Sequence, residues 1–388
     1  MQLVKTGRDN LLRPLQTVSG IVERRHTLPI LANILIRKEG NAVSFLSTSY
    51  LYPSPILART KRYKILSTDT EIQIVTHAEI GTTEEDATTT VAARKLLDIL
   101  RALPDSSDIV ISLNDKRLVV SAGKSRFSLQ TLPADDFPTV SQPLEYETSV
   151  TLTQKSLKNL FSMVYFAMAQ QDIRYYLNGL LLQVDGKTIK AVATDGHRLA
   201  FCQMETDQEF PKNDVIIPRK TILELQRLLE DSEDPVRIDF SGAQVRFVFG
   251  DVELISKLVE GKFPDYTRVI PKGYKNKFVI SRELLQRALQ RAAIMTSDKF
   301  KGIRCILAAG SLKISSTNAD QEEAIEEIEL DYAGDNIDIG FNVTYLLDVL
   351  GNLKNDETSI ELGDANSSAL ISIPDNTDFK YVVMPMRI

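Results

Sequence analysis

The 388-residue sequence predicts an α+β fold made of three tandem copies of one domain. One order of elements, a short strand, a polar residue and an amphipathic helix, occurs three times. Two motifs also recur 126 residues further along the chain. Thr68-Asp69 recurs as Thr194-Asp195, and Phe137-Pro138 recurs as Phe263-Pro264. This period is far longer than the roughly 20–50 residues of a solenoid unit, so it indicates repeated whole domains.

The first helix of each copy is expected directly after a short apolar strand. These strands are residues 3–5, 150–152 and 278–280, and the helices after them are residues 11–18, 157–161 and 284–289. The helix starts are assigned to residues that commonly cap helix N-termini: Asp9 or Asn10, Thr153 and Ser281.

A second helix recurs in each copy, at residues 90–100, 215–225 and 339–350. Alternating strands follow, for example residues 236–240 and 359–362. Each copy therefore has two helices on one face of antiparallel sheet. The predicted domains are residues 1–143, 144–272 and 273–388.

The first copy has an insert near residues 48–67 that the other copies lack. It carries four cations, no acid and two prolines, which discourage a regular strand. Two interpretations stay open: a solvated hairpin extension, or an extra contact to phosphate or to a partner, since aromatic residues alternate with cations.

Composition excludes several classes of protein. The net charge of −6 argues against holding nucleic acid by bulk positive charge, so a DNA role needs a segregated basic surface or a mechanism other than affinity. No apolar run reaches the roughly 18 residues of a membrane span, and no signal peptide is evident. Cys202 and Cys305 form neither a ligand set nor a disulfide framework, which favours a reducing cytoplasm.

No motif for cofactor binding or catalysis is complete in this sequence. Gly123-Lys124-Ser125 and Gly186-Lys187-Thr188 resemble the end of a phosphate loop, but Leu118 and Leu181 replace the required earlier glycines. The three histidines lack metal-ligand spacing, and no Gly-x-Ser-x-Gly turn is present. We therefore expect no cofactor and no metal.

The stretch from Ala193 to Ala200 contains Asp195-Gly196-His197-Arg198 between two apolar runs. Asp185-Gly186 and Asp195-Gly196 are hairpin-type dipeptides, so the segment predicts a three-stranded meander. Adjacent strand residues point to opposite faces, and the polar side chains here cannot all converge on one substrate. This disfavours acid–base catalysis, although an enzyme that uses Asp195 and His197 is an alternative.

Several long motifs resemble the bacterial DNA polymerase III beta subunit, the replicative sliding clamp. They are residues 194–200, 172–179, 263–266 and the C-terminal 382–388, and the resemblance covers essentially the whole chain. It implies a non-catalytic processivity subunit of a DNA-directed DNA polymerase holoenzyme, acting in DNA replication in the cytoplasm. It also implies a head-to-tail homodimeric ring that a clamp loader places around double-stranded DNA, bound without sequence specificity. The ring would tether the replicative polymerase, and would bind other polymerases and repair proteins through short peptides.

The resemblance also implies site residues. A peptide cleft between the second and third domains would comprise Leu177, Thr194, Gly196, His197, Arg198, Leu199, Pro264, Arg268, Val269, Val382, Val383, Met384, Pro385, Met386, Arg387 and Ile388. DNA contacts would include Arg25 and Gln171, with Arg174, Tyr175 and Tyr176 close by. The dimer seam would use Lys95, Arg117, Lys124, Arg126, Phe127, Leu129, Ile294, Met295, Glu322 and Glu323.

Enclosure would reconcile a DNA role with an acidic chain. Cations gather on the predicted helices: Arg8, Arg13, Arg94, Lys95, Arg101, Lys155, Lys158, Arg219, Lys220, Arg227, Arg282, Arg287 and Arg291. Two chains supply twelve helices, and at about 10 Å each they make a circle of roughly 120 Å with an opening of about 28 Å. Duplex DNA of roughly 20 Å would pass. The alternative is a repeat scaffold that binds peptides without DNA.

Overall fold

The computed structural model describes residues 1–22, 28–50, 70–82, 85–140, 143, 145–297 and 301–387. It divides into two compact units, Met1–Ser156 with Arg227–Leu258, and Leu157–Gln226 with Val259–Ile388. Most of the predicted insert, residues 51–67, lies outside the described residues, as do Arg25 and Ile388. In the described residues, no helix is long and apolar enough to cross a bilayer.

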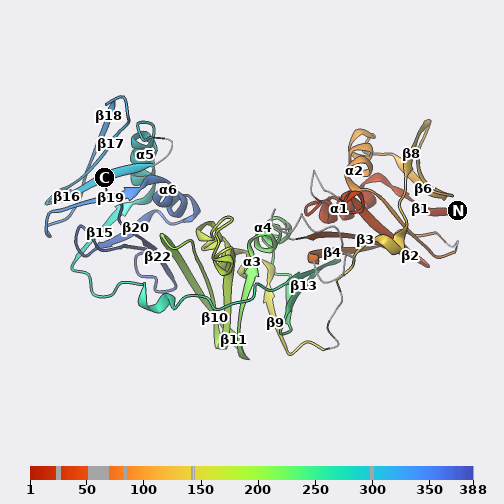
Figure 1. The fold of residues 1–388 in the computed structure, drawn as a ribbon, viewed down its shortest axis with the longest axis horizontal. Coiled ribbons are helices and arrows are strands. Elements are labelled where there is room, and N and C mark those ends of the chain that lie inside the picture. Colours follow the sequence, from red (N-terminus) through yellow and green to blue (C-terminus); the bar gives the residue numbers. More distant parts are fainter. Residues whose placement is uncertain are drawn as a thin grey trace, which may run out of the picture. The chain divides into compact units, whose positions relative to one another are not determined.

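The first unit contains two antiparallel sheets (Figure 1). One has the order β1 (Gln2–Gly7), β6 (Asp108–Asn114), β7 (Arg117–Ala122) and β8 (Ser125–Gln130). The other has the order β5 (Ala87–Ala92), β2 (Asn33–Glu39), β3 (Ala42–Tyr50), β4 (Thr70–Glu79), β14 (Val252–Lys257), β13 (Gln244–Phe249), β12 (Pro235–Phe240) and β9 (Thr148–Thr153). Pairing of β4 with β14 makes one continuous sheet from strands of two predicted domains.

The second unit also contains two antiparallel sheets. The six-stranded sheet has the order β10 (Gly179–Thr194), β11 (Arg198–Pro218), β22 (Phe379–Val383), β21 (Ala369–Ser372), β20 (Glu357–Leu362) and β15 (Asn276–Ser281). The four-stranded sheet has the order β18 (Glu323–Glu329), β17 (Ser311–Thr317), β16 (Gly302–Ala308) and β19 (Ile337–Asn342). The pairing of β11 with β22 joins strands of the second and third predicted domains.

Six α-helices occur in the described residues, two for each predicted domain. They are α1 (Arg8–Ser19), α2 (Ala93–Ala102), α3 (Gln154–Ser162), α4 (Arg219–Leu228), α5 (Arg282–Ala293) and α6 (Val343–Asn352). Helix α1 packs on α2, and α5 packs on α6. The predicted α+β pattern of paired helices and antiparallel sheet is confirmed.

The helix starts agree with the sequence prediction in two copies and differ in the first. Ser281 accepts a hydrogen bond from the Leu284 backbone amide at 3.4 Å, and Thr153 Oγ1 accepts one from the Ser156 amide at 3.2 Å. Helix α1 instead begins at Arg8, before Asp9 and Asn10. The reason is tertiary, because the buried Arg8 side chain donates to the Leu100 carbonyl of α2 at 2.7 Å.

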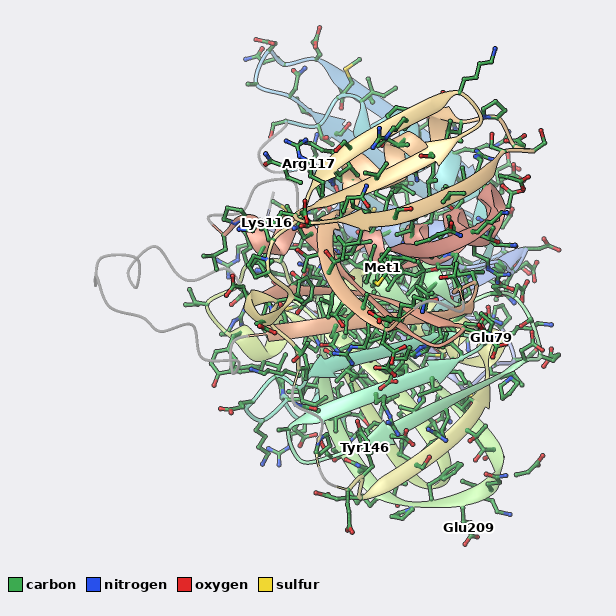
Figure 2. The ribbon with its side chains drawn as sticks, turned by 90° about the vertical axis from the view of Figure 1, so that its right-hand side faces the viewer. Met1, Glu79, Lys116, Arg117, Tyr146 and Glu209 are labelled. Atoms are coloured by element: carbon green, nitrogen blue, oxygen red, sulfur yellow. The ribbon has the colours of Figure 1, made fainter. Side chains whose placement is uncertain are left out.

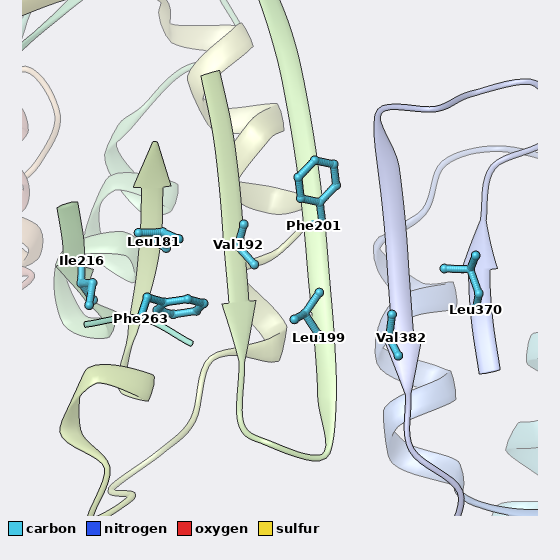
Figure 3. Packing of buried hydrophobic residues seen from close by; sticks show 8 residues of the cluster. All are labelled: Leu181, Val192, Leu199, Phe201, Ile216, Phe263, Leu370 and Val382. Carbon is cyan, nitrogen blue, oxygen red and sulfur yellow. The ribbon is translucent and has the colours of Figure 1, made fainter. Parts of the chain in front are cut away.

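The predicted meander lies in β10 and β11. Figure 3 shows Leu181 and Val192 on neighbouring arrows that run in opposite directions, and Gly186 between them has a φ of +59°. The chain reverses again at Asp195–His197, where Thr194 pairs with Leu199. Both Asp-Gly dipeptides therefore interrupt regular strand pairing, as expected for residues that accept positive φ.

Thr90 organises a buried polar junction in the first unit and supplies a stability test. Its hydroxyl accepts from Asn33 Nδ2 at 3.1 Å and from the Leu132 amide at 3.1 Å, and it donates to the Leu132 carbonyl at 2.8 Å. Thr90→Val keeps the side-chain shape and leaves these buried groups unpaired, so we expect a loss of about 1–3 kcal/mol in urea unfolding.

Thr89→Val is the matched control for this substitution. Thr89 is also buried on β5, and its hydroxyl makes no hydrogen bond with any described residue. Equal stability of the Thr90→Val and Thr89→Val proteins would contradict the assigned role of the Thr90 hydroxyl.

Candidate functional site

A cavity of about 200 Å³ opens beside the Asp195–His197 turn in the second unit. Four segments form it: residues 174–177, the end of β10 with the start of β11, the strap of residues 264–269, and the end of β22 with the C-terminal tail. The lining residues are Arg174, Tyr176, Leu177, Thr194, Gly196, His197, Arg198, Leu199, Pro264, Tyr266, Val269, Val382 and Met384. We call this cavity the cleft.

The cleft stands on a buried apolar cluster of the six-stranded sheet. Figure 3 shows its eight residues: Leu181, Val192, Leu199, Phe201, Ile216, Phe263, Leu370 and Val382. The strap is fixed on this face because Tyr266 donates to Gln183 Oε1 at 2.6 Å and packs its ring 5.8 Å from that of Phe201. Leu199 and Val382 are cross-strand partners on β11 and β22, so the sheet itself sets the floor of the cleft.

The Asp195–His197 turn is held by its own side chains. The Asp195 carboxylate accepts from the backbone amides of His197 at 2.9 Å and Arg198 at 3.0 Å. Thr194 Oγ1 accepts from the Gly196 amide at 3.1 Å and donates to the Arg198 carbonyl at 2.6 Å. Gly196 has a φ of +90°, a conformation that favours glycine, and the Arg174 guanidinium lies directly against it.

Arg198 connects this turn to helix α6. Its buried guanidinium donates to Asp348 Oδ2 at 2.5 Å, Asp195 Oδ2 at 3.2 Å and the Phe166 carbonyl at 2.8 Å. It also lies 4.5 Å from the centroid of the Tyr345 ring. Burial alone would lower the pKa of Arg198, but interactions with Tyr381 and Asp348 outweigh burial and raise it. The Arg198 cation is therefore bound by partners within the fold.

Arg174 closes one side of the cleft. It donates from Nε and Nη2 to the two oxygens of Asp172, at 3.0 and 2.8 Å, and from Nη2 to the Asp195 carbonyl at 3.1 Å. The hydrogen bond from the Arg174 side chain lowers the pKa of Asp172 to about 2, so this carboxylate is ionised at neutral pH. The paired charges fix the loop of residues 172–174 against the turn.

The C-terminal tail completes the opposite side. The Met384 amide donates to the His197 carbonyl at 2.9 Å, and the Met386 amide donates to the Gly340 carbonyl at 2.8 Å. The Met384 side chain is 43% exposed in the cleft. Main-chain hydrogen bonds therefore hold the tail while a flexible apolar side chain is presented to the solvent.

The arrangement is suited to binding and not to proton transfer. In the cleft, the Asp195 carboxylate is occupied by two backbone amides and Arg198, so it does not contact His197 as a base partner. The described residues contain no group of three or more side chains that could hold a metal ion. Burial raises the pKa values of Cys202 and Cys305 to about 12, which leaves both thiols protonated.

The structure brings together ten of the residues predicted for the cleft. They are Leu177, Thr194, Gly196, His197, Arg198, Leu199, Pro264, Val269, Val382 and Met384. Val383 is not among the lining residues, because it follows Val382 on β22 and its side chain is fully buried in the core. Arg268 is exposed and pairs with Asp265 at 2.9 Å, while Pro385, Met386 and Arg387 lie outside the lining.

The prediction missed the aromatic residue Tyr266 in the cleft. Arg174 and Tyr176, which the resemblance places close to the DNA contacts, also lie in the cleft lining. The Phe263-Pro264-Asp265-Tyr266 motif was the available signal for Tyr266. Among the other residues predicted for DNA, Tyr175 is 56% exposed and Gln171 is exposed with a φ of +55°.

The residues predicted for the seam lie on β7, β8 and β18 with their turns, on helix α2 and directly after helix α5. Arg117, Lys124 and Arg126 are exposed around β7 and β8, with Arg117 next to Lys116 at the β6–β7 turn (Figure 2), and Lys95 is exposed on α2. Phe127 and Leu129 are half-buried on one face of the edge strand β8. In the second unit, Ile294 is 72% exposed and Met295 half-buried, while Glu322 and Glu323 are exposed. Ile325 on the edge strand β18 is 52% exposed and was not predicted.

Comparison with known proteins supports one family along the whole chain. Three family models match in order: the DNA polymerase III beta subunit N-terminal domain (residues 2–52 and 55–141), central domain (151–265) and C-terminal domain (267–387). The beta sliding clamp of Pseudomonas putida is 46% identical over 382 residues, and that of Escherichia coli is 41% identical over 381, each covering 98% of both chains.

Solved structures agree with the sequence comparison. The DNA polymerase III subunit beta of Pseudomonas aeruginosa has a TM-score of 0.90 at 44% identity and covers all of both chains. A second structure from that organism, bound to griselimycin, matches equally well, with a TM-score of 0.90. The chain therefore belongs to the family of bacterial DNA polymerase III beta subunits, the beta sliding clamps.

Proposed function

We propose that two copies of this chain close head to tail around duplex DNA, and that the cleft of each copy binds a short apolar peptide of a polymerase or clamp loader. The chain is a non-catalytic processivity subunit, as its family membership establishes. The observation that carries the proposal is the apolar cleft beside a tethered C-terminal tail. We further propose domain bounds of 1–143, 144–272 and 273–388, and a cytoplasmic location.

The chemistry of the cleft favours a peptide with apolar anchors. Its floor is formed by Leu177, Leu199 and Val382, and its sides by Pro264, Val269 and Met384. A volume of about 200 Å³ accommodates one or two apolar side chains, and such anchors supply most of the affinity in peptide recognition. The binding of griselimycin by a Pseudomonas aeruginosa relative supports a ligand-binding role in this family.

Enclosure lets the ring hold DNA with weak contacts. Several helix cations are paired with acids: Arg13 contacts Glu230 at 2.9 Å, Lys155 contacts Glu233 at 3.3 Å, and Arg291 contacts Glu326 at 2.5 Å. Partial neutralisation weakens non-specific binding to phosphate and makes it sensitive to salt. We assign DNA contacts to Arg25, Gln171 and Tyr175, and a supporting position to Arg174 and Tyr176.

The seam is proposed between β8 of one copy and β18 of the other. Both are edge strands of four-stranded sheets, and such edges can pair between chains. One edge carries Arg126 with Phe127 and Leu129, and the other carries Glu323 with Ile325. Opposite charges around apolar residues make the two edges complementary. Such a contact between different surfaces closes into a ring when two copies meet twice.

The cleft is tested by Met384→Asp, which places a charge against its apolar floor. We expect binding of a fluorescent apolar peptide to weaken at least tenfold, about 1.4 kcal/mol, because the carboxylate loses water when the peptide docks. Ile173→Asp is the control, since Ile173 is 95% exposed and lies outside the lining. Equal peptide affinity of the two variants would contradict the assignment of the cleft as the peptide site.

The ring is tested by Ile294→Asp, with Val279→Asp as the control. Both residues are exposed, at 72% and 43%, but only Ile294 is assigned to the seam. We expect the Ile294 variant to sediment as a monomer, because a buried charge at the seam opposes closure. A dimer of unchanged stability would contradict this seam.

Retention on DNA gives the functional readout for the same proteins. Wild-type ring loaded by a clamp loader on nicked circular DNA should stay bound, and should dissociate once the circle is linearised. Behaviour that does not depend on linearisation would favour the alternative, a repeat scaffold that binds peptides without DNA.

A further inference from the structure

A second cavity, of about 410 Å³, lies in the first unit and has no part in the cleft. Helix α1, strand β4, the start of α3, the end of α4 and the β13–β14 turn surround it. Its floor is buried and its rim is exposed, so it is a pocket with one open side. We call it the junction pocket.

The floor of the junction pocket holds polar groups with unused hydrogen-bonding capacity. Thr76 is 3% exposed, and its hydroxyl makes no hydrogen bond with any described residue. Gln154 is 6% exposed, and its Oε1 accepts only from the Glu230 amide, at 3.1 Å, which leaves one lone pair. The Thr76 hydroxyl is reached by solvent in the pocket, so it can form a hydrogen bond with a ligand that enters there.

The rim of the junction pocket is acidic. Its lining carries Glu230, Asp234 and Asp251 and one cation, Arg13, and the Arg227 guanidinium donates to the carbonyl of the lining residue Thr17 at 2.8 Å. Arg13 is engaged with Glu230 at 2.9 Å, and Asp234 accepts from the Ser232 hydroxyl at 3.1 Å. Within the described chain, the carboxylate of Asp251 has no ion pair. The rim therefore favours a positively charged ligand.

The walls between rim and floor are apolar. Pro14 and Phe249 are buried, and Leu228 and Val252 are half-buried. Such walls suit methylene groups and do not suit a hydrated metal ion, and the described residues contain no cluster of three metal-ligating side chains. An anion is disfavoured by the carboxylates at the rim.

We propose that the junction pocket binds a short aliphatic diamine or polyamine. One ammonium group donates to the Thr76 hydroxyl and Gln154 Oε1 at the floor. The methylene chain lies along Pro14, Phe249 and Val252, and the second ammonium group lies among the rim carboxylates. The floor, the walls and the rim of the pocket then each contact a complementary part of the ligand. This binding does not depend on the clamp function.

Calorimetric titration of the full-length protein with 1,4-diaminobutane tests this assignment. We expect one saturable site per chain. Thr76→Val, which removes the floor hydroxyl at constant shape, should weaken binding about tenfold, since a hydrogen bond to a charged group is lost. Asp234→Asn should weaken binding about two- to fivefold, as expected for an exposed charge.

Two controls distinguish binding at a specific site from non-specific electrostatic attraction to an acidic protein. Asp115→Asn removes an exposed carboxylate at the β6–β7 turn, outside the pocket, and should leave the affinity unchanged. The probe n-butylamine, with one charge, should bind much more weakly than the diamine. The proposal is overturned by non-saturable binding, by an Asp115→Asn effect as large as that of Asp234→Asn, or by equal affinity for n-butylamine. If Thr76→Val lowers the thermal stability, Asp251→Asn replaces it and must weaken binding as Asp234→Asn does.

Discussion

The buried guanidinium of Arg198 is the interaction on which the cleft depends. A charge removed from water is costly, and here the cost is offset by two carboxylates, a carbonyl and an aromatic face. Asp195 belongs to the turn, Asp348 to helix α6 and Phe166 to the segment after α3. One side chain therefore holds together elements that are far apart in the sequence, and its removal would leave Asp348 without this partner.

The Asp195–His197 turn also connects the cleft to the C-terminal tail and to the six-stranded sheet. Asp195 fixes the backbone of His197 and Arg198, and the His197 carbonyl in turn receives the Met384 amide of the tail. The pairing of β11 with β22 continues directly from this contact. Strand pairing between predicted domains thus positions the cleft residues more rigidly than a loop could.

Much of the fold could be predicted from the sequence because its signals are periodic and repeated. The helix pairs, the caps at Thr153 and Ser281, and the antiparallel strands all follow from local patterns. The start of α1 could not, because Arg8 is drawn into the helix by its hydrogen bond to Leu100, a residue 92 positions away.

The site was predicted less completely, for two physical reasons. Ten cleft residues followed from the resemblance, but Val382 and Val383 are adjacent on a strand and cannot both face the cleft, an alternation that the sequence already implied. Tyr176 and Tyr266 enter the lining through tertiary packing on the apolar cluster, which no local pattern specifies. Arg174 also lines the cleft, because Asp172 and the Asp195 carbonyl hold it beside Gly196.

The most direct test of the account is peptide binding by Arg198→Lys. Lysine keeps the charge but cannot donate at once to Asp195, Asp348 and the Phe166 carbonyl, as the planar guanidinium does. We expect the affinity for a fluorescent apolar peptide to fall about tenfold or more while the chain stays folded, because the turn is released from α6. Wild-type affinity in the Arg198→Lys protein would show that charge alone is sufficient and would contradict this account of the cleft.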